Sequence, residues 1–229
     1  ALEVLERIAI EKRCEFVLVG KDVMFDKVNS SLDGQTIHIV NALQPSELNL
    51  QLPLLGEHQV ENAAVAYTAL KVSGIKLSEE AIQRGFFRVK WRARFEIARR
   101  EPPVIFDSAH NTDSFRKLNQ TLNEYFPGQK IYLIFGASED KNILDMFEVM
   151  KPRIKKVMIT RADHPRALEV EKIIELAQQA GVPYEAVEPV ESAFERALEN
   201  SANDGSIVLS AGSMFVTAEV MRAWDKINA

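Results

Sequence analysis

The stretch VIFDSAHNTDSFRKL, from Val104 to Leu118, decides the fold class of this sequence. Its first apolar residues are typical of a buried strand, and its second half begins a helical pattern. Between them stand an acid, a histidine and an amide, namely Asp107, His110 and Asn111. A polar loop between a buried strand and a helix is typical of a βαβ unit, in which the loop lies at the carboxyl end of the strand.

The same alternation of strand and helix continues to the end of the chain. Strand-sized apolar runs occur at 104–106, 131–135, 156–160, 184–187 and 207–209. Helical patterns alternate with them at 114–125, 143–150, 169–179, 192–199 and 215–224. We therefore predict an α/β fold over residues 92–229, with a Rossmann-like, mostly parallel sheet covered by helices on both faces.

The first part of the chain, residues 1–91, has a different rhythm. We predict a helix at 2–13, strands at 16–19, 36–40 and 48–52, and helices at 57–73 and 78–88, the last capped by Ser78. The chain opens inside a helical pattern, with no methionine and no capping residue, so we expect it to be a piece of a longer protein.

Composition excludes several classes of function. A net charge of −5 argues against a nucleic-acid-binding surface, and the basic run Lys90–Arg100 is interpreted as the polar face of a strand. The single cysteine, Cys14, rules out an intrachain disulfide and fits a reducing compartment. No apolar run approaches transmembrane length. We expect a cytoplasmic protein that works as a monomer, without a membrane or nucleic-acid partner.

Polar loops rich in small residues follow three of the predicted strands. They are Asp107–Asn111, Gly136–Lys141 and Ser210–Ser213. In a parallel sheet with right-handed crossovers these loops share one edge, where helix N-termini favour anions. The pattern indicates a small-molecule site at that edge.

An ordered set of motifs resembles a known family. The motifs are LGEHQVENAA at Leu55–Ala64, WRARFE at Trp91–Glu96, DSAHN at Asp107–Asn111 and GASEDK at Gly136–Lys141, with later blocks at Pro165–Ala167 and Gly212–Phe215. In this order they resemble folylpolyglutamate synthase/dihydrofolate synthase, the folate-directed relatives of the Mur ligases.

The resemblance implies an ATP-dependent ligase with a magnesium cofactor. ATP phosphorylates the carboxylate of folate or dihydropteroate, and the amine of L-glutamate attacks the acyl phosphate to form an amide. Such chemistry depends on aligning anionic partners and neutralising phosphate charge with cations. The resemblance also implies that residues 1–91 end a central ATP-binding domain and that residues 92–229 form the C-terminal domain.

Roles can be carried over residue by residue. The resemblance assigns cofactor binding to Asn62 (base), Arg94 (phosphates) and Asp107 (ribose), catalysis to His110 and Lys141, and substrate binding to Asp140, Ser213 and Arg166, with His164 beside the last. Each side chain also has a structural alternative, namely helix capping, a solvated charge or turn formation.

The sequence departs from the family pattern at several positions. Arg92-Ala93 stand where the family has Pro-Gly, Ser108 replaces a glycine and Thr112 replaces a proline, so we expect a more restricted backbone. No Gly-x-x-x-x-Gly-Lys-Ser/Thr motif occurs. The resemblance places the magnesium ligands and a modified lysine upstream of Ala1. No metal ligand is therefore assigned here, and we expect the isolated chain to be inactive without the N-terminal segment of the same protein.

Two other hypotheses stay open. One is a Mur-type amino-acid ligase acting on a peptidoglycan precursor, although the Asp107–Asn111 loop resembles the folate branch more closely. The other is a non-catalytic nucleotide- or metabolite-binding module, which the missing phosphate-binding motif and the two lost glycines support. The start of the chain inside a helix argues against it.

Overall fold

The computed structural model describes residues 2–42 and 46–228. It divides into two compact units, one made of Ala1–Pro53 and Glu57–Val89, the other of Leu54–Gly56 and Lys90–Ala229. Each unit is described by itself.

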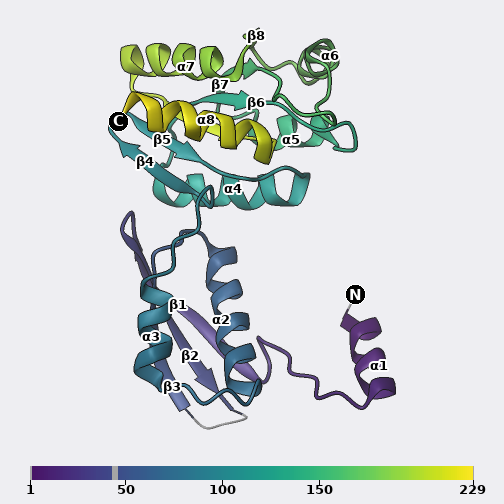
Figure 1. Cartoon of the computed structure of the whole chain (residues 1–229), viewed down its shortest axis with the longest axis vertical. Helices are drawn as coiled ribbons and strands as arrows, with labels where there is room; N and C mark the ends of the chain where they lie inside the picture. Colours follow the sequence, from purple (N-terminus) through teal and green to yellow (C-terminus); the bar gives the residue numbers. More distant parts are fainter. Residues whose placement is uncertain (1, 43–45, 229) are drawn as a thin grey trace. The chain divides into compact units, whose positions relative to one another are not determined.

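The first unit contains a small antiparallel sheet packed against helices (Figure 1). Its elements are α1 (Leu2–Lys12), β1 (Val23–Ser31), β2 (Gly34–Asn41), β3 (Ser46–Leu52), α2 (Glu57–Val72) and α3 (Glu79–Phe87). The strand order is β1-β2-β3, with α2 against β1 and β2 and α3 against β3. Alternate residues of β2 and β3 are buried, as expected for a sheet with one covered face.

Two details of this unit bear on the predictions. The predicted strand at 16–19 is wrong, because within it only Val19 forms an isolated bridge, to Val23. The neighbouring strand β1 was not predicted, since most of its side chains are exposed and give no clear apolar alternation. The Ser78 cap is confirmed, because its side chain accepts a hydrogen bond from the Ala81 N–H at 3.2 Å.

The second unit is a six-stranded sheet with helices between its strands (Figure 1). Its elements are β4 (Glu96–Arg100), β5 (Pro103–Phe106), α4 (Thr112–Tyr125), β6 (Ile131–Phe135), α5 (Ile143–Met150), β7 (Ile154–Ile159), α6 (Val170–Ala180), β8 (Tyr184–Ala186), α7 (Val190–Asp204), β9 (Ile207–Ala211) and α8 (Met214–Ile227). The strand order is β4-β5-β9-β6-β7-β8, and every neighbouring pair is parallel except β4 with β5. The predicted α/β fold with a mostly parallel sheet is confirmed.

Both faces of this sheet are covered, because successive strand residues point to opposite sides. Phe106 of β5 packs edge-on against Phe194 of α7 and Trp224 of α8, with ring centroids 6.4 and 6.3 Å away. Phe135 of β6 points to the other face and packs against Phe115 of α4 at 6.2 Å. The continuous apolar runs of the sequence correspond to these doubly buried strands.

The antiparallel edge strand decides which segments meet at the functional edge. Glu96, the first residue of β4, pairs with Phe106, the last residue of β5. The turn that precedes β4 therefore lies at the carboxyl edge of the parallel strands, beside the loop that follows β5. Parallel strands alone would have left that turn at the opposite edge.

Candidate functional site

Asp107 is held in the loop after β5 by four hydrogen bonds. Its Oδ2 accepts from the Phe95 N–H at 2.8 Å, and its Oδ1 accepts from the Ala109 N–H at 2.7 Å. Its own N–H donates to the Ser210 carbonyl at 3.0 Å, and its carbonyl accepts from the Thr217 hydroxyl at 3.1 Å. The carboxyl group is thus held by the turn that precedes β4, and the backbone of Asp107 is held by β9 and α8.

The environment of Asp107 perturbs its titration. Burial raises the pKa of this carboxyl to about 6, from an ordinary 3.8, because the charged form loses hydration. The Ala109 and Phe95 N–H groups and the positive charges of Arg94 and His110 oppose the rise. A half-buried carboxyl that titrates near neutrality at a sheet edge is typical of a functional site.

His110 has a defined tautomer in this loop. Its Nδ1 lies 2.9 Å from the Ser108 carbonyl oxygen, and since a carbonyl only accepts, Nδ1 carries the hydrogen. Nε2 then remains able to accept a proton or, when the ring is charged, to donate. Asn111 caps α4 in a capping box with Ser114. The buried Ser108 hydroxyl has no hydrogen-bond partner among the described residues.

The turn before β4 places Arg94 beside this loop. The predicted strand over 90–100 is correct only for Glu96–Arg100, since the residues before Glu96 form a turn. Ala93 and Phe95 have left-handed backbones, with φ of +55° and +48°. The Ala93 carbonyl accepts from the Ser108 N–H at 3.0 Å. Ala93, where the resemblance expects glycine, occupies the conformation for which glycine is least strained. Ser108, the other replacement, does not.

Arg94 and Arg92 have different partners in this turn. The Arg94 guanidinium lies over the Trp91 ring, 5.3 Å from its centroid. Arg92 instead forms ion pairs with Glu96 at 2.9 Å and with Asp225 of α8 at 3.6 Å.

Close backbone approaches bring the other loops to the same edge. A Cβ on Gly212, whose φ is +104°, would lie 2.5 Å from the Phe135 ring and 2.7 Å from the Gly136 carbonyl oxygen. A Cβ on Gly136 would lie 2.7 Å from the Thr160 carbonyl oxygen. The Gly212 N–H also donates to the Ala109 carbonyl at 2.7 Å. The loops after β5, β9, β6 and β7 therefore form one continuous rim.

The predicted residues after β6 and β7 lie on this rim. Lys141 and Asp140 form an ion pair, with Nζ 2.7 Å from Oδ2. That hydrogen bond from Lys141 lowers the pKa of Asp140, and the charge of Arg166 contributes in the same direction. A bridge between Ser138 and Ala167 joins the two loops. The structure therefore brings Asp140, Lys141 and Arg166 together.

Ser213 is the N-cap of α8. Its Oγ accepts from the Phe215 N–H at 3.2 Å, and the residue is buried. The Ser213 oxygen accepts this capping hydrogen bond, and the hydroxyl can still donate its hydrogen to a ligand.

Asn62 belongs to the first unit and is exposed on α2. Its amide donates to the Gln59 side-chain oxygen at 3.3 Å, and the Gln59 amide contacts His58 Nε2 at 3.1 Å. These three side chains form a polar row along the start of the helix.

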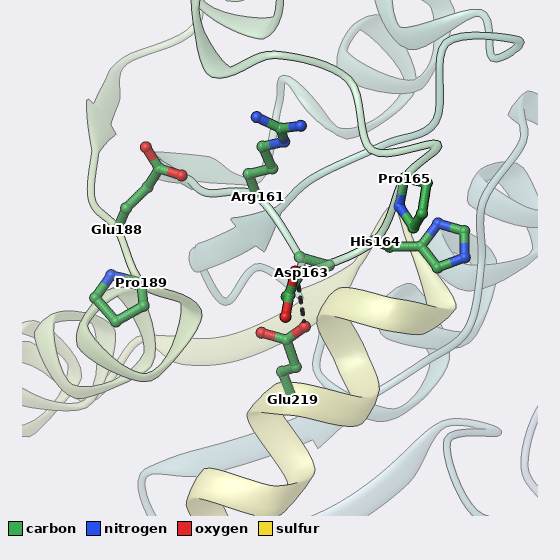
Figure 2. Close-up of a pocket in the computed structure, with 8 residues that line it drawn as sticks. Arg161, Asp163, His164, Pro165, Glu188, Pro189 and Glu219 are labelled. Atoms are coloured by element: carbon green, nitrogen blue, oxygen red, sulfur yellow. Dashed lines mark hydrogen bonds between the residues drawn. The ribbon is translucent and has the colours of Figure 1, made fainter.

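A cleft of about 690 Å³ opens beside the rim, between the loops after β7 and β8 and helix α8 (Figure 2). It is lined by Arg161, Ala162, Asp163, His164, Pro165, Glu188, Pro189 and Glu219. The Asp163 N–H donates to Glu219 at 3.0 Å, so the two acids lie close together. Its lining includes three carboxylates, those of Asp163, Glu188 and Glu219, and one guanidinium, that of Arg161, so negative charge predominates in the cleft.

Several of these residues were not singled out in the sequence. Arg161, Glu188 and Glu219 come from separate elements with no motif spacing, so only the fold brings them to one cleft. Trp91 lay within a recognised motif but received no role. Its position three residues before Arg94 was the only feature of the sequence that could have indicated a role for this aromatic residue.

The described ranges, 2–42 and 46–228, contain neither a metal-binding cluster nor a membrane-spanning helix. No three His, Cys, Asp or Glu side chains there gather to hold a metal ion. No helix within the same ranges has the length and apolar content needed to cross a membrane.

Comparison with known proteins connects this geometry to a family. Residues 93–214 match the family described as Mur ligase, glutamate ligase domain. The chain is 32% identical over 182 residues to a probable bifunctional folylpolyglutamate synthase/dihydropteroate synthase of Haloferax volcanii, covering 78% of this chain and 21% of that protein. It is 29% identical over 196 residues to the UDP-N-acetylmuramoyl-L-alanyl-D-glutamate–2,6-diaminopimelate ligase of Caldanaerobacter subterraneus, covering 82% of this chain and 40% of that protein.

A solved structure extends the similarity. The folylpolyglutamate synthase of Mycobacterium tuberculosis, complexed with ADP and AMPPCP, matches with a TM-score of 0.85 at 26% identity, over 97% of this chain and 52% of that chain. The chain thus spans about half of this solved relative and less than half of the two curated ones.

Proposed function

Because the chain belongs to the Mur ligase family, we propose that it is part of an ATP-dependent ligase that joins L-glutamate to folate or dihydropteroate. The relatives named folylpolyglutamate synthase and the DSAHN loop support this choice of substrates. Residues 1–91 would then end a central ATP-binding domain, and residues 92–229 would form the C-terminal domain. The protein would act in the cytoplasm as a monomer.

The observation that carries the proposal is the convergence of Arg94, Asp107 and His110 at one sheet edge. Arg94 offers planar N–H donors that suit phosphate oxygens. Each Asp107 oxygen accepts one backbone N–H and retains a lone pair for a ribose hydroxyl. The same loop also holds the buried Ser108 hydroxyl, which has no hydrogen-bond partner among the described residues.

The donor set fits a nucleotide better than a resident metal. ATP, when bound, supplies the phosphoryl group that activates the substrate carboxylate. As the resemblance implies, the magnesium ligands would lie in a portion of the protein that corresponds to the part of the solved relative that this chain does not span. Asn62 would contact the nucleotide base, as the resemblance implies.

The remaining rim residues would serve the acceptor side of the reaction. Lys141 would neutralise charge near the transferred group, and Asp140 would hold the Lys141 ammonium in place at 2.7 Å. His110 would hold or move a proton at Nε2. Arg166 and the Ser213 hydroxyl would bind substrate carboxylates.

Nucleotide binding by this chain tests the proposal directly. We expect calorimetric titration with ADP to show binding that Asp107→Ala and Arg94→Ala each weaken by about tenfold, the loss of one charge-assisted contact. Asp113→Asn is the matched control, because Asp113 is an exposed acid in the first turn of α4. Equal affinity for ADP in all variants would contradict the assignment.

Ligase activity tests the completeness of the chain. We expect no incorporation of labelled glutamate into folate by this chain alone, and detectable ligation would contradict that. The coding region upstream of Ala1 should contain a strand–Gly-x-x-x-x-Gly-Lys-Ser/Thr–helix segment. A start codon at that place, with no such segment, would favour the hypothesis of a non-catalytic nucleotide-binding module over that of a ligase.

A second candidate is a Mur-type ligase with a different amino acid. The acidic cleft beside the rim favours it, because Asp163, Glu188 and Glu219 would repel the side-chain carboxylate of glutamate and attract a second amine. The relative named as a 2,6-diaminopimelate ligase supports the same alternative. Competition assays of the full-length enzyme with glutamate and a diamino acid would separate the two candidates.

A further inference from the structure

Trp91 is a large aromatic side chain that contributes little to the core. It is 61% exposed, whereas Trp224 packs against Phe106 and Phe194 inside the second unit. The Trp91 ring lies under the Arg94 guanidinium, with 5.3 Å between the Arg94 Cζ and the ring centroid. An exposed indole in contact with a cation indicates a role outside core packing.

The backbone around Arg94 is fixed on both sides. The preceding residue, Ala93, accepts a hydrogen bond from the Ser108 N–H at 3.0 Å, and the following residue, Phe95, donates to Asp107 at 2.8 Å. The left-handed conformations of Ala93 and Phe95 reverse the chain between these two anchors. The main freedom left at Arg94 is therefore the rotation of its own side chain.

An aromatic partner restricts that rotation without cancelling the charge. Arg92 shows the contrast, since its guanidinium is neutralised by the carboxylates of Glu96 and Asp225. Among the described residues Arg94 forms no ion pair within 4.0 Å, and its contact with the ring does not use its N–H donors in a hydrogen bond to a carboxylate. A guanidinium held in this way is pre-organised for an anionic ligand.

We infer that Trp91 is a positioning residue, which holds the Arg94 guanidinium beside the Asp107 loop for the phosphate groups of a bound nucleotide. The inference rests on the nucleotide binding proposed above. Trp91 would affect nucleotide binding only through the position of Arg94. Removal of the Trp91 ring should therefore weaken phosphate binding and leave the contacts to the nucleoside unchanged.

The first test needs no ligand. Carbon-13 NMR of the Asp107 carboxyl reports the position of Arg94, because the positive charge of Arg94 lowers the pKa of Asp107, as does that of His110. We expect Trp91→Ala and Arg94→Ala to move the titration midpoint upward, the double variant to move it no further than Arg94→Ala, and Trp91→Phe to restore it. An unchanged midpoint in Trp91→Ala overturns the inference.

The second test compares ADP with adenosine by calorimetry. We expect Trp91→Ala to weaken ADP about two- to fivefold, Trp91→Phe to recover most of the loss, and adenosine affinity to stay the same. Phe87→Ala is the matched control, because Phe87 is an exposed aromatic residue at the end of α3, 60% exposed. Equal losses for both ligands would mean that Trp91 contacts the nucleoside itself, which overturns the inference. If the unmodified chain bound neither ADP nor adenosine, the proposal that this chain binds a nucleotide would be wrong. The NMR titration of Asp107 would still test whether Trp91 positions Arg94.

Discussion

As the pH rises, replacing Asp107 by asparagine should make the second unit progressively more stable relative to the unmodified protein. The half-buried carboxyl has a pKa of about 6 in the folded chain against an ordinary 3.8, and burial is the main cause. At about 1.4 kcal/mol per pKa unit, the ionised form costs the folded state roughly 3 kcal/mol of unfolding free energy.

The sign follows from proton binding. Between the ordinary pKa and the folded pKa, the folded chain binds more protons than the unfolded chain, so raising the pH lowers the free energy of unfolding. Below pH 3.8 Asp107 is protonated in both states, and above about pH 6 the full cost is present. Asparagine cannot ionise, so the unfolding free energy of Asp107→Asn does not fall in this way at high pH.

The amide also loses one acceptor. Phe95 and Ala109 each donate to a different Asp107 oxygen, and one of these N–H groups would face the amide nitrogen. That mismatch costs about 1–3 kcal/mol at every pH. The informative quantity is therefore the change with pH in the difference between the two proteins, not the difference at one pH.

Urea unfolding followed by tryptophan fluorescence measures this quantity, because both tryptophans belong to the second unit. Between pH 4 and pH 8 the Asp107→Asn protein should gain roughly 3 kcal/mol relative to the unmodified protein. The exposed Asp113→Asn variant should show a nearly constant difference. A constant difference for Asp107→Asn as well would refute the claim that burial raises the pKa of this carboxyl.

Three further substitutions test the backbone and the packing, each by urea unfolding. Ala93→Gly should raise the unfolding free energy by roughly 0.5–1 kcal/mol because φ is +55°, whereas Ala98→Gly, at the register shift of β4 and without a left-handed backbone, should lower it. Gly212→Ala should lower it by about 3 kcal/mol or more, because its Cβ would collide with the backbone and an aromatic ring, whereas Gly205→Ala meets nothing within 4 Å and should cost only about 1 kcal/mol. Arg153→Met should cost about 2–4 kcal/mol, since it removes the hydrogen bonds that this buried guanidinium donates to the Phe126 carbonyl, at the C-cap of α4, and to the Gln129 carbonyl in the loop that follows, and Arg153→Lys should recover only part. These assignments would be contradicted by equal changes in unfolding free energy for Ala93→Gly and Ala98→Gly, or for Gly212→Ala and Gly205→Ala. An unchanged unfolding free energy in Arg153→Met would contradict the assignment of Arg153.

The sequence determined the fold class of the second unit because its strands are buried on both faces. Such strands appear as continuous apolar runs, and the helices between them show a clear period, so the element order follows from local patterns. Met146, Phe147 and Met150 illustrate this, since they recur at helical spacing within the predicted helix at 143–150 and all three are buried. The same logic failed for β1, whose mostly exposed side chains give no such signal.

The ordered motifs also determined the family, and they pointed to Asp107 as the central residue of the site. The motif residues stand next to one another along the chain, so their recognition needs no knowledge of distant contacts. Their functional roles remain predictions.

Only the tertiary structure decided which of these residues meet. Arg94 reaches the Asp107 loop because β4 runs antiparallel to β5, and strand direction depends on pairing between segments that no local pattern records. The raised pKa of Asp107, the contact between Trp91 and Arg94, and the acidic cleft that includes Glu188 and Glu219 all depend on burial or on neighbours distant in sequence. The physical reason is that hydration and electrostatic energy depend on distances in space, which the chain fixes only after it has folded.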